Sequence, residues 1–324
     1  MEMLRQRVPL WSPSANTLAG RIHRATGGVV RVLDAGDTPA LRRLMAADPV
    51  SNVSVITTLA ARGGAGPGKG RNGAVFLGID APPETTRPPG QEGPAVGGTV
   101  TRKELAAACW VGSNINPVGA DLAQAELFGL AVGAMRRRVS SIYGPAEAVL
   151  ELYDAVGWLS PRDVRADQPL LTITQASTVE PLTGVRTATV EDYPQVEPAC
   201  AAMFTEELGF SPYAQGSAQY RERIRALILA GHSQVFTDPA TGEVIFKAEY
   251  GAVTDDVVQI QGVWVRPDHR GRGLAATGMA AVVSHALTLA PTVSLYVNSY
   301  NTAALRAYLR VGFRQVGTFA TVLF

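Results

Sequence analysis

The chain contains few of the residues that mark specialised classes of protein. Only two cysteines, Cys109 and Cys200, occur in 324 residues, which is too few for a disulfide framework and fits a reducing compartment such as the cytoplasm. No run of about 18 apolar residues is present, so we expect no membrane span. The four histidines lie at positions 23, 232, 269 and 285, without matching cysteine or carboxylate spacing, and we expect no metal site.

The chain also lacks an excess of charge of either sign. It has 29 Lys and Arg against 28 Asp and Glu, a net charge of +1, so nothing in the overall balance favours nucleic acid or a membrane surface as a partner. Its 46% hydrophobic residues can form an ample core, and its length predicts about two domains. Residues 1–27 carry scattered Arg and Pro without an apolar core, so we expect a flexible leader rather than a signal peptide.

The most informative stretch is residues 262–275, Gly-Val-Trp-Val-Arg-Pro-Asp-His-Arg-Gly-Arg-Gly-Leu-Ala. Its flanks predict a strand over Val257–Val265 and a helix over Ala275–Leu289. The glycines between them precede a helix start, which offers unpaired N–H groups and a positive dipole end. Glycine lets a phosphate approach that backbone closely. The pattern predicts a pyrophosphate cradle, and it matches neither the Rossmann nor the Walker spacing.

A second pattern follows at residues 301–313, Asn-Thr-Ala-Ala-Leu-Arg-Ala-Tyr-Leu-Arg-Val-Gly-Phe. Thr292–Asn298 before it reads as a short strand. Asn301 is a good helix N-cap, and Gly312 stands where a C-terminal cap belongs. We therefore expect a strand and then a short capped helix.

Together the two patterns resemble the GCN5-related N-acetyltransferases, the GNAT family. The family's acyl-coenzyme A loop, Arg/Gln-x-x-Gly-x-Gly/Ala, is matched by Arg270, Gly273 and Ala275. Its closing helix, Asn-x-x-Ala-x-x-x-Tyr-x-x-x-Gly-Phe, is matched at every position from Asn301 to Phe313. The resemblance covers about residues 184–324. It implies an α/β fold with a mixed (α+β) sheet, a catalytic domain over 184–324 and acetyl-CoA as the acyl donor.

The resemblance also assigns cofactor contacts. The pyrophosphate would bind the backbone of the loop, whose residues are Arg270, Gly271, Arg272, Gly273, Leu274 and Ala275. The pantetheine arm would pair with the strand end, which consists of Val263, Trp264 and Val265. Asn301 is an N-cap, a pantetheine contact, or both. His269 and Arg272 border the loop and are either phosphate contacts or solvated turn residues.

Two catalytic roles follow from the resemblance. Tyr308 would protonate the departing thiolate, or it is a core aromatic on an amphipathic helix. The base that deprotonates the amine has three candidates, Glu206, Glu207 and Glu249, and for each the alternative is a solvated surface carboxylate. Other family members often place a glutamate on the strand where this chain has Gln259 and Gln261. That departure favours a proton path through water or through the pair at 206 and 207.

The first half of the chain repeats the closing pattern. Tyr153, Gly157 and Trp158 precede their counterparts in the closing helix, Tyr308, Gly312 and Phe313, by a constant 155 residues. Each of these segments is expected to follow a strand. We infer two tandem GNAT-like units, 28–175 and 184–324. The boundary is expected within 161–184, where the apolar run 170–173 is either the last strand of the first unit or a bridging strand.

The first unit lacks a recognisable cradle. At the same offset, Ile115, Val118 and Ala120 stand where the second unit has its loop residues, and Ala146 replaces the capping asparagine. We therefore predict that unit 28–175 is degenerate and serves as a scaffold or substrate wall. The glycine-rich run 63–70 half matches a Walker loop, but Gly70 replaces the Ser or Thr, and a strand is expected next, so we interpret it as a plain loop. The proline-rich segment 81–98 is expected to be a mobile loop.

The leading function is therefore acetyl-CoA-dependent N-acetyl transfer to a primary amine, by direct attack in a ternary complex. The acceptor is a small molecule, a protein lysine or a protein N-terminus, and the oligomeric state stays open. One alternative is an acyl-CoA-binding sensor or regulatory module with weak turnover. Another is acetylation of a small amino-sugar thiol, because the tandem architecture also resembles that of mycothiol synthases. Transfer from aminoacyl-tRNA fits the neutral charge balance poorly.

Overall fold

The computed structural model describes residues 17–69, 73–82, 104–158, 160–214 and 216–324. The chain divides into two compact units. Unit 1 consists of the residues up to Ala166 together with Phe319–Phe324, and unit 2 consists of Asp167–Thr318. Both are mixed α/β structures, as the sequence predicts, and each is described by itself.

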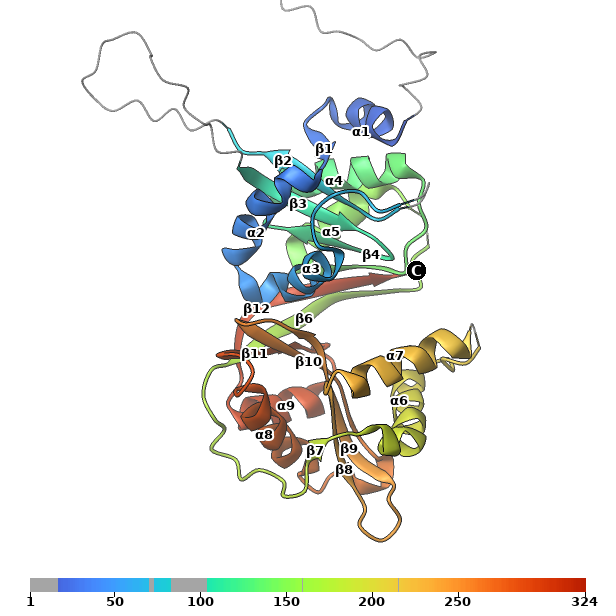
Figure 1. The fold of residues 1–324 in the computed structure, drawn as a ribbon, viewed down its shortest axis with the longest axis vertical. Coiled ribbons are helices and arrows are strands. Elements are labelled where there is room, and N and C mark those ends of the chain that lie inside the picture. Colours follow the sequence, from blue (N-terminus) through green and yellow to red (C-terminus); the bar gives the residue numbers. More distant parts are fainter. Residues whose placement is uncertain (1–16, 70–72, 83–103, 159, 215) are drawn as a thin grey trace, which may run out of the picture. The chain divides into compact units, whose positions relative to one another are not determined.

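Unit 1 is a sheet with helices on both faces (Figure 1). Its elements are α1 (Leu18–Thr26), β1 (Val30–Val32), a 3-10 turn at Ala35–Asp37, α2 (Thr38–Ala46), α3 (Pro49–Arg62), β2 (Val75–Asp80), β3 (Leu105–Val111), β4 (Asn114–Val118), α4 (Leu122–Met135), β5 (Ser141–Pro145), α5 (Ala146–Val156) and the start of β6 (Asp163–Ile173). The strand order is β1-β2-β3-β4-β5-β12. One apolar core lies under α1, α4 and α5, and another lies under α2 and α3.

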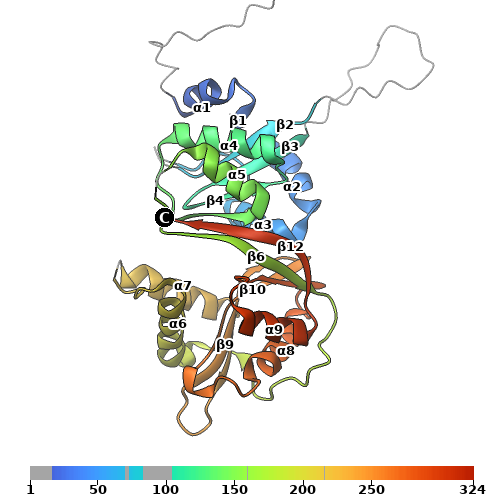
Figure 2. The ribbon, with the colours of Figure 1, turned by 180° about the vertical axis from the view of Figure 1, so that it is seen from behind.

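Unit 2 has the same layered plan, with α8 and α9 on one face of its sheet and α6 and α7 on the other (Figures 1 and 2). Its elements are the rest of β6, β7 (Arg186–Thr187), a 3-10 turn at Val190–Asp192, α6 (Tyr193–Leu208), α7 (Ser217–Leu229), β8 (Ser233–Thr237), β9 (Val244–Val253), β10 (Val257–Val265), a 3-10 turn at Pro267–His269, α8 (Leu274–Ala286), β11 (Thr292–Tyr296), α9 (Thr302–Val311) and β12 (Arg314–Leu323). The strand order is β6-β11-β10-β9-β8-β7.

The two units repeat one order of elements. From β1 to β6 and from β7 to β12, each runs strand, 3-10 turn, two helices, three strands, helix, strand, helix, strand, and the second unit adds the 3-10 turn at Pro267–His269 before α8. The closing helices α5 and α9 both end at a glycine with positive φ, 68° at Gly157 and 114° at Gly312. This conformation strains any residue with a Cβ, which explains why the glycine recurs. The tandem repeat predicted from the sequence is confirmed.

The constant offset does not extend to the cradle, however. Ile115 and Val118 lie inside strand β4, and only Ala120 lies in the connection to α4. That connection is residues 119–121, three residues, whereas the connection between β10 and α8 is residues 266–273, eight residues. The positions compared by offset are therefore not structural counterparts. The first unit has a shorter loop, and insertions or deletions in loops shift any fixed offset.

The expectation for the N-terminal leader is corrected in part. Residues 1–16 lie outside the described residues, but Leu18–Thr26 forms helix α1, capped by Thr17, with Ile22 only 1% exposed in the unit 1 core. An amphipathic segment with a buried face is part of the fold rather than a free leader. Most of the segment expected to be a mobile loop, residues 83–98, also lies outside the described residues.

The last strand of each sequence half contributes to the sheet of the other unit. β6 begins in unit 1, and its residues Leu170–Ile173 pair with β11 in unit 2. The end of β12 belongs to unit 1, where Phe319–Leu323 pairs with β5. The divisions fall after Ala166 and after Thr318, while the domains 28–175 and 184–324 stay a prediction.

Candidate functional site

Strands β10 and β11 part early in unit 2. Their parallel pairing covers three positions, from Val257 opposite Thr292 to Gln259 opposite Ser294. β10 continues to Val265, held on its other side by β9. Beyond Gln259, this edge of β10 no longer pairs with β11. Such an edge presents backbone donors and acceptors to an extended ligand.

Helix α8 begins without a side-chain cap. Its N-cap is Gly273, with φ 81°, and no side chain accepts a hydrogen bond from the first turn. A Cβ added at Gly271 or Gly273 would meet nothing within 4 Å. Open space therefore lies beside the two loop glycines, at the positive end of this 13-residue helix. This is the arrangement that binds phosphates.

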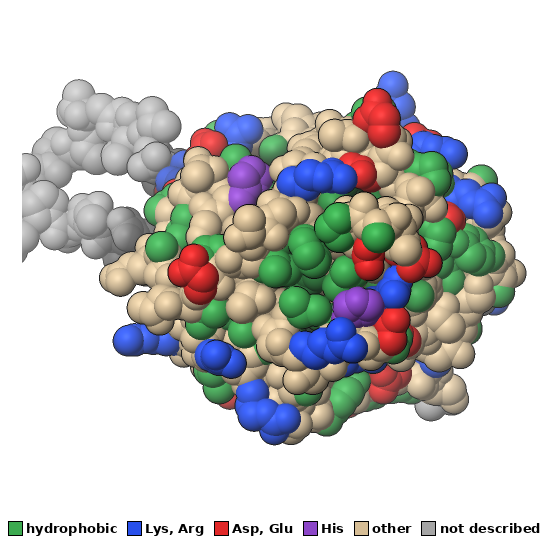
Figure 3. Space-filling view, turned by 90° about the horizontal axis from the view of Figure 1, so that it is seen from below, with side chains coloured by type: hydrophobic (Ala, Val, Ile, Leu, Met, Phe, Trp, Pro, Cys, Tyr) green, Lys and Arg blue, Asp and Glu red, His purple; other side chains and the backbone are tan. Residues whose placement is uncertain are grey.

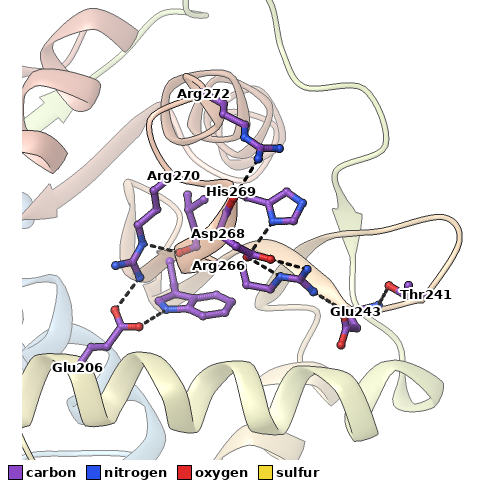
Figure 4. Close-up of polar contacts among 10 residues, drawn as sticks. Glu206, Thr241, Glu243, Arg266, Asp268, His269, Arg270 and Arg272 are labelled. Carbon is purple, nitrogen blue, oxygen red and sulfur yellow. Dashed lines mark hydrogen bonds and ion pairs between the residues drawn. The ribbon is translucent and has the colours of Figure 1, made fainter.

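Arg270 connects the loop to two other elements. Its Nε donates to the Val265 carbonyl at 2.9 Å, and its Nη2 lies 2.7 Å from Glu206 Oε2 on α6. The other carboxylate oxygen, Oε1, accepts from Trp264 Nε1 at 3.3 Å (Figure 4). The structure thus brings the loop, the strand end and one predicted base together. It also ties Glu206 into an ion pair.

The rim of the loop carries a second polar network (Figure 4). The Asp268 carboxylate accepts from Arg266 Nε at 2.8 Å and lies 2.9 Å from His269 Nδ1. Arg266 also pairs with Glu243, and Arg272 Nη2 donates to the Asp268 carbonyl at 3.1 Å. The hydrogen bond from Arg266, and then that from His269, lowers the pKa of Asp268. In this structure His269 and Arg272 therefore interact with Asp268, beside the expected phosphate position.

Tyr308 lies on α9 in the apolar core of unit 2. It is 7% exposed, and its ring packs against Phe313 at 6.1 Å between centroids. Burial, and then the charge of Glu207, raises the pKa of the phenol. Tyr308 is both the core aromatic and a protonated phenol within electrostatic reach of α6. Asn301 caps α9, since its side chain accepts from the Ala304 N–H at 3.2 Å.

Part of unit 2 matches a known protein family in sequence. Residues 200–313 match the family model of the acetyltransferase (GNAT) family. The chain contains a GNAT acetyltransferase domain. The protein is accordingly an acyltransferase. A second family model, a domain of unknown function named DUF4081, matches residues 95–196. No curated protein matches the chain significantly in sequence.

Solved structures show the same fold at low identity. A GCN5-related N-acetyltransferase from Sphaerobacter thermophilus is 18% identical with a TM-score of 0.58, and the match covers 91% of this chain and 95% of that one. A Drosophila protein is 13% identical with a TM-score of 0.57, covering 91% and 98%. A GNAT-family acetyltransferase from Colwellia psychrerythraea is 14% identical with a TM-score of 0.53, covering 91% and 99%. The chain thus resembles GNAT structures over nearly its whole length.

The three candidate bases of the GNAT domain have different environments. Glu206 is paired with Arg270, as described above. Glu249 on β9 is 5% exposed, and its Oε1 lies 2.8 Å from Lys247 Nζ and 3.3 Å from Cys200 Sγ. Glu207 is exposed on α6, and its charge reaches Tyr308. Only Glu207 combines solvent access with proximity to the predicted acid.

Lys247 and Cys200 were not singled out by sequence reasoning. Burial alone would raise the pKa of Glu249, but the charge and hydrogen bond of Lys247 lower it overall. Burial raises the pKa of the Cys200 thiol to about 12. The sequence does carry a signal for this pair. A lysine and a glutamate, two residues apart, lie on the same side of an otherwise apolar strand, Val-Ile-Phe-Lys-Ala-Glu-Tyr.

Unit 1 has a different arrangement at the corresponding helix start. The Asp121 carboxylate caps α4 by accepting from the Gln124 N–H at 2.8 Å, and the Gln124 side chain accepts from the Asp121 N–H at 3.0 Å. Where β4 and β5 cease to pair after Ile115, the Asn116 amide donates across to the Tyr143 carbonyl at 2.9 Å. A carboxylate thus lies at the helix start, and a side chain bridges the two strands.

Two features are absent from the part of the chain that the structure describes. No helix there is both long and apolar enough to cross a membrane. No group of three or more His, Cys, Asp or Glu side chains there is arranged to hold a metal ion.

Proposed function

We propose that the protein is an acetyl-CoA-dependent N-acetyltransferase that moves an acetyl group to a primary amine by direct attack in a ternary complex. The observation that carries the proposal is the uncapped start of α8 at Gly273, beside the edge of β10 that has left β11. One feature suits a diphosphate and the other suits an extended amide-containing arm. Acetyl-CoA has both, and it is the donor that the GNAT family implies.

The loop and the strand end would each bind a different part of the donor. The backbone from Arg270 to Ala275 would receive the diphosphate. The backbone of Val263 and Val265 would pair with the pantetheine arm. Arg270 now donates to the Val265 carbonyl, so pairing of the arm at that carbonyl would have to share or displace this contact. Asn301 would remain a helix cap close to the arm.

Proton transfer would use Glu207 and Tyr308, and burial and then the charge of Glu207 raise the pKa of Tyr308. The amine attacks the thioester carbonyl carbon, a C–N bond forms and the C–S bond breaks. Glu207, directly or through water, would accept the proton that the amine loses. Tyr308 would donate its proton to the departing thiolate. The raised pKa of Tyr308 keeps the phenol protonated at neutral pH, which is the form that a general acid requires.

Unit 1 would not bind the donor. The Asp121 carboxylate occupies the anion position at the start of α4, and the Asn116 side chain closes the gap beside β4. Both features oppose a diphosphate and a pantetheine arm. We therefore propose that unit 1 is a scaffold or substrate wall. The face of the molecule in Figure 3 shows acidic and basic side chains interspersed, which fits a small or peptide amine better than nucleic acid. Two buried free thiols, Cys109 and Cys200, fit the cytoplasm.

A thiol-release assay against an amine panel tests the function, and titration calorimetry on the full chain tests the binding. We expect one acetyl-CoA per chain and release of CoA with at least one of the amino sugars, amino acids, polyamines or peptides. Turnover with a cysteinyl sugar would assign the mycothiol-synthase-like activity. Binding of acetyl-CoA without turnover of any amine would instead support the sensor. Two acetyl-CoA molecules per chain would contradict the role of unit 1.

A further inference from the structure

A lysine with no exposed surface lies inside unit 2. Lys247 on β9 is 0% exposed. Its ammonium donates to Glu249 Oε1 at 2.8 Å and to the Gly262 carbonyl at 2.8 Å, and it lies 3.5 Å from Met203 Sδ. A buried ion pair is weak evidence for stability, because apolar residues of similar size often serve as well. Its contact with the Gly262 carbonyl suggests another role.

Gly262 is part of a β-bulge in β10. Gln261 lies opposite Glu249 and Trp264 lies opposite Lys247, so Gly262 and Val263 together stand opposite a single residue of β9. Gly262 has φ 60°, and an added Cβ would lie 3.0 Å from Glu249 Oε2 and 3.3 Å from Lys247 Nζ. The bulge therefore packs directly on the ion pair, and a side chain at Gly262 would be strained by the positive φ and tight against Glu249.

The ammonium fixes the orientation of one peptide group. The Gly262 carbonyl accepts from the Lys247 ammonium at 2.8 Å. In a planar trans peptide the following N–H, that of Val263, points in the opposite direction. It is thus directed away from the ion pair. The bulge also lies in the section of β10 beyond Gln259, where β10 has parted from β11.

We propose that the Lys247–Glu249 ion pair is a positioning device that holds the Gly262–Val263 peptide so that the Val263 N–H donates to the carbonyl oxygen of the bound thioester. This inference rests on the proposed function. As the amine attacks, negative charge develops on that oxygen, and a fixed donor stabilises it more than it stabilises the ground state. Lys247 and Glu249 touch no substrate and act through the backbone.

The double variant K247M/E249M tests the proposal. It removes both charges while keeping similar volume, so neither partner is left buried and unpaired. We expect kcat to fall by about tenfold to a hundredfold, with KM for acetyl-CoA within about threefold, because the diphosphate cradle is unchanged. S233A is the matched control: Ser233 is buried beside Glu249, and its hydroxyl has no hydrogen-bond partner among the residues that the structure describes. It should leave kcat unchanged.

Isotope-edited infrared spectroscopy gives a readout that needs no acceptor. With acetyl-CoA labelled with 13C at the acetyl carbonyl, the carbonyl stretch should be lower in the wild type and S233A than in free solution. In K247M/E249M it should return toward the solution value. A double variant that melts earlier but keeps the wild-type kcat and carbonyl frequency would make the pair purely structural and overturn the proposal.

A second variant covers the case in which K247M/E249M does not fold. G262A disturbs the same peptide through the strained φ and the contact with Glu249, and it should lower kcat and raise the carbonyl frequency. Retention of both wild-type values in G262A overturns the inference. If the wild type binds acetyl-CoA with a shifted carbonyl but acetylates no amine, the proposed function fails while the positioning of the peptide stands.

Discussion

At the scale of single residues, two tyrosines at equivalent helix positions have different surroundings. Tyr308 on α9 is 7% exposed, and the charge of Glu207 acts on it. Tyr153 on α5 is half-buried and packs against Phe324 at 6.2 Å between ring centroids. The same residue in the same repeat position is therefore half-buried in one unit and buried near a carboxylate charge in the other, where we propose that it is the proton donor.

Removing the Tyr308 hydroxyl tests its role as the acid. We expect Tyr308→Phe to lower kcat at least about tenfold, because the thiolate loses its proton donor, with little change in the affinity for acetyl-CoA. Steady-state kinetics and calorimetry measure the two quantities. The control is Tyr153→Phe, the same change at the counterpart in unit 1, which should alter neither.

The pH profile of kcat tests the direction of the Tyr308 pKa shift. Burial and the charge of Glu207 raise the pKa of Tyr308 above its ordinary value near 10, so the acid stays protonated until the pH exceeds that value. The wild-type kcat should therefore show no alkaline decline due to this group below about pH 10. An alkaline limb below pH 10 that disappears in Tyr308→Phe would contradict the raised pKa.

At the scale of elements, the difference between the two units lies at the start of one helix. α8 begins after an eight-residue connection at an uncapped glycine, Gly273. α4 begins after a three-residue connection at Asp121, which forms a capping box with Gln124. A side-chain cap and a bound phosphate compete for the same N–H groups. The capped start of α4 is therefore less suited to a diphosphate than the uncapped start of α8.

Placing a carboxylate at the open helix start should abolish donor binding. We expect Gly273→Glu to weaken the affinity for acetyl-CoA by about a hundredfold or more, about 2.7 kcal/mol, because the charge and bulk occupy the phosphate position. Calorimetry measures it. The matched control is Gly242→Glu in the turn between β8 and β9, where φ is 72° and an added Cβ also meets nothing within 4 Å.

The control separates binding from strain. Both variants place a side chain at positive φ, at a cost of about 1–2 kcal/mol, and both add one negative charge. We expect similar small decreases in melting temperature and normal binding in Gly242→Glu. Equal affinities of Gly273→Glu and the wild type would refute the cradle.

At the scale of the whole molecule, the end of the chain completes the first unit. Phe319–Leu323 pairs with β5, and Ala320 and Val322 are 0% exposed in the core beneath α4 and α5. Phe324 packs edge-on against Trp158 at 5.2 Å between ring centroids. The folding of unit 1 therefore depends on residues that lie more than 150 positions further along the chain.

A charge in this part of β12 should destabilise unit 1. We expect Val322→Asp to reduce the free energy of unfolding by about 3 kcal/mol or more, because a carboxylate would be buried without a partner. Urea denaturation measures it, and hydrogen exchange should increase first in β5. Val316→Asp is the control on the same strand, since Val316 is 58% exposed, and it should change stability by about 0.5 kcal/mol or less. Increased exchange confined to β8 and β9 would contradict the assignment.

The sequence by itself determined the repeat, the family of the second unit and the strand–loop–helix segment in which we propose the cradle. These follow from local patterns: the strand over Val257–Val265, the capped helix after Asn301, and glycines at positions where the backbone has a positive φ. Contiguous residues carry such signals, because turn and cap conformations depend on near neighbours. Helix α1 was missed because its apolar face is short and becomes decisive only against a core.

Only the tertiary structure decided which carboxylate's charge reaches Tyr308, that Glu206 pairs with Arg270, and that Lys247 donates to the Gly262 carbonyl in the bulge. It alone placed the end of β12 in unit 1 and the carboxylate of Asp121 at the start of α4. These contacts join residues from separate strands and helices. Pairing across a sheet and burial of charge depend on the register of distant segments, which no local pattern encodes.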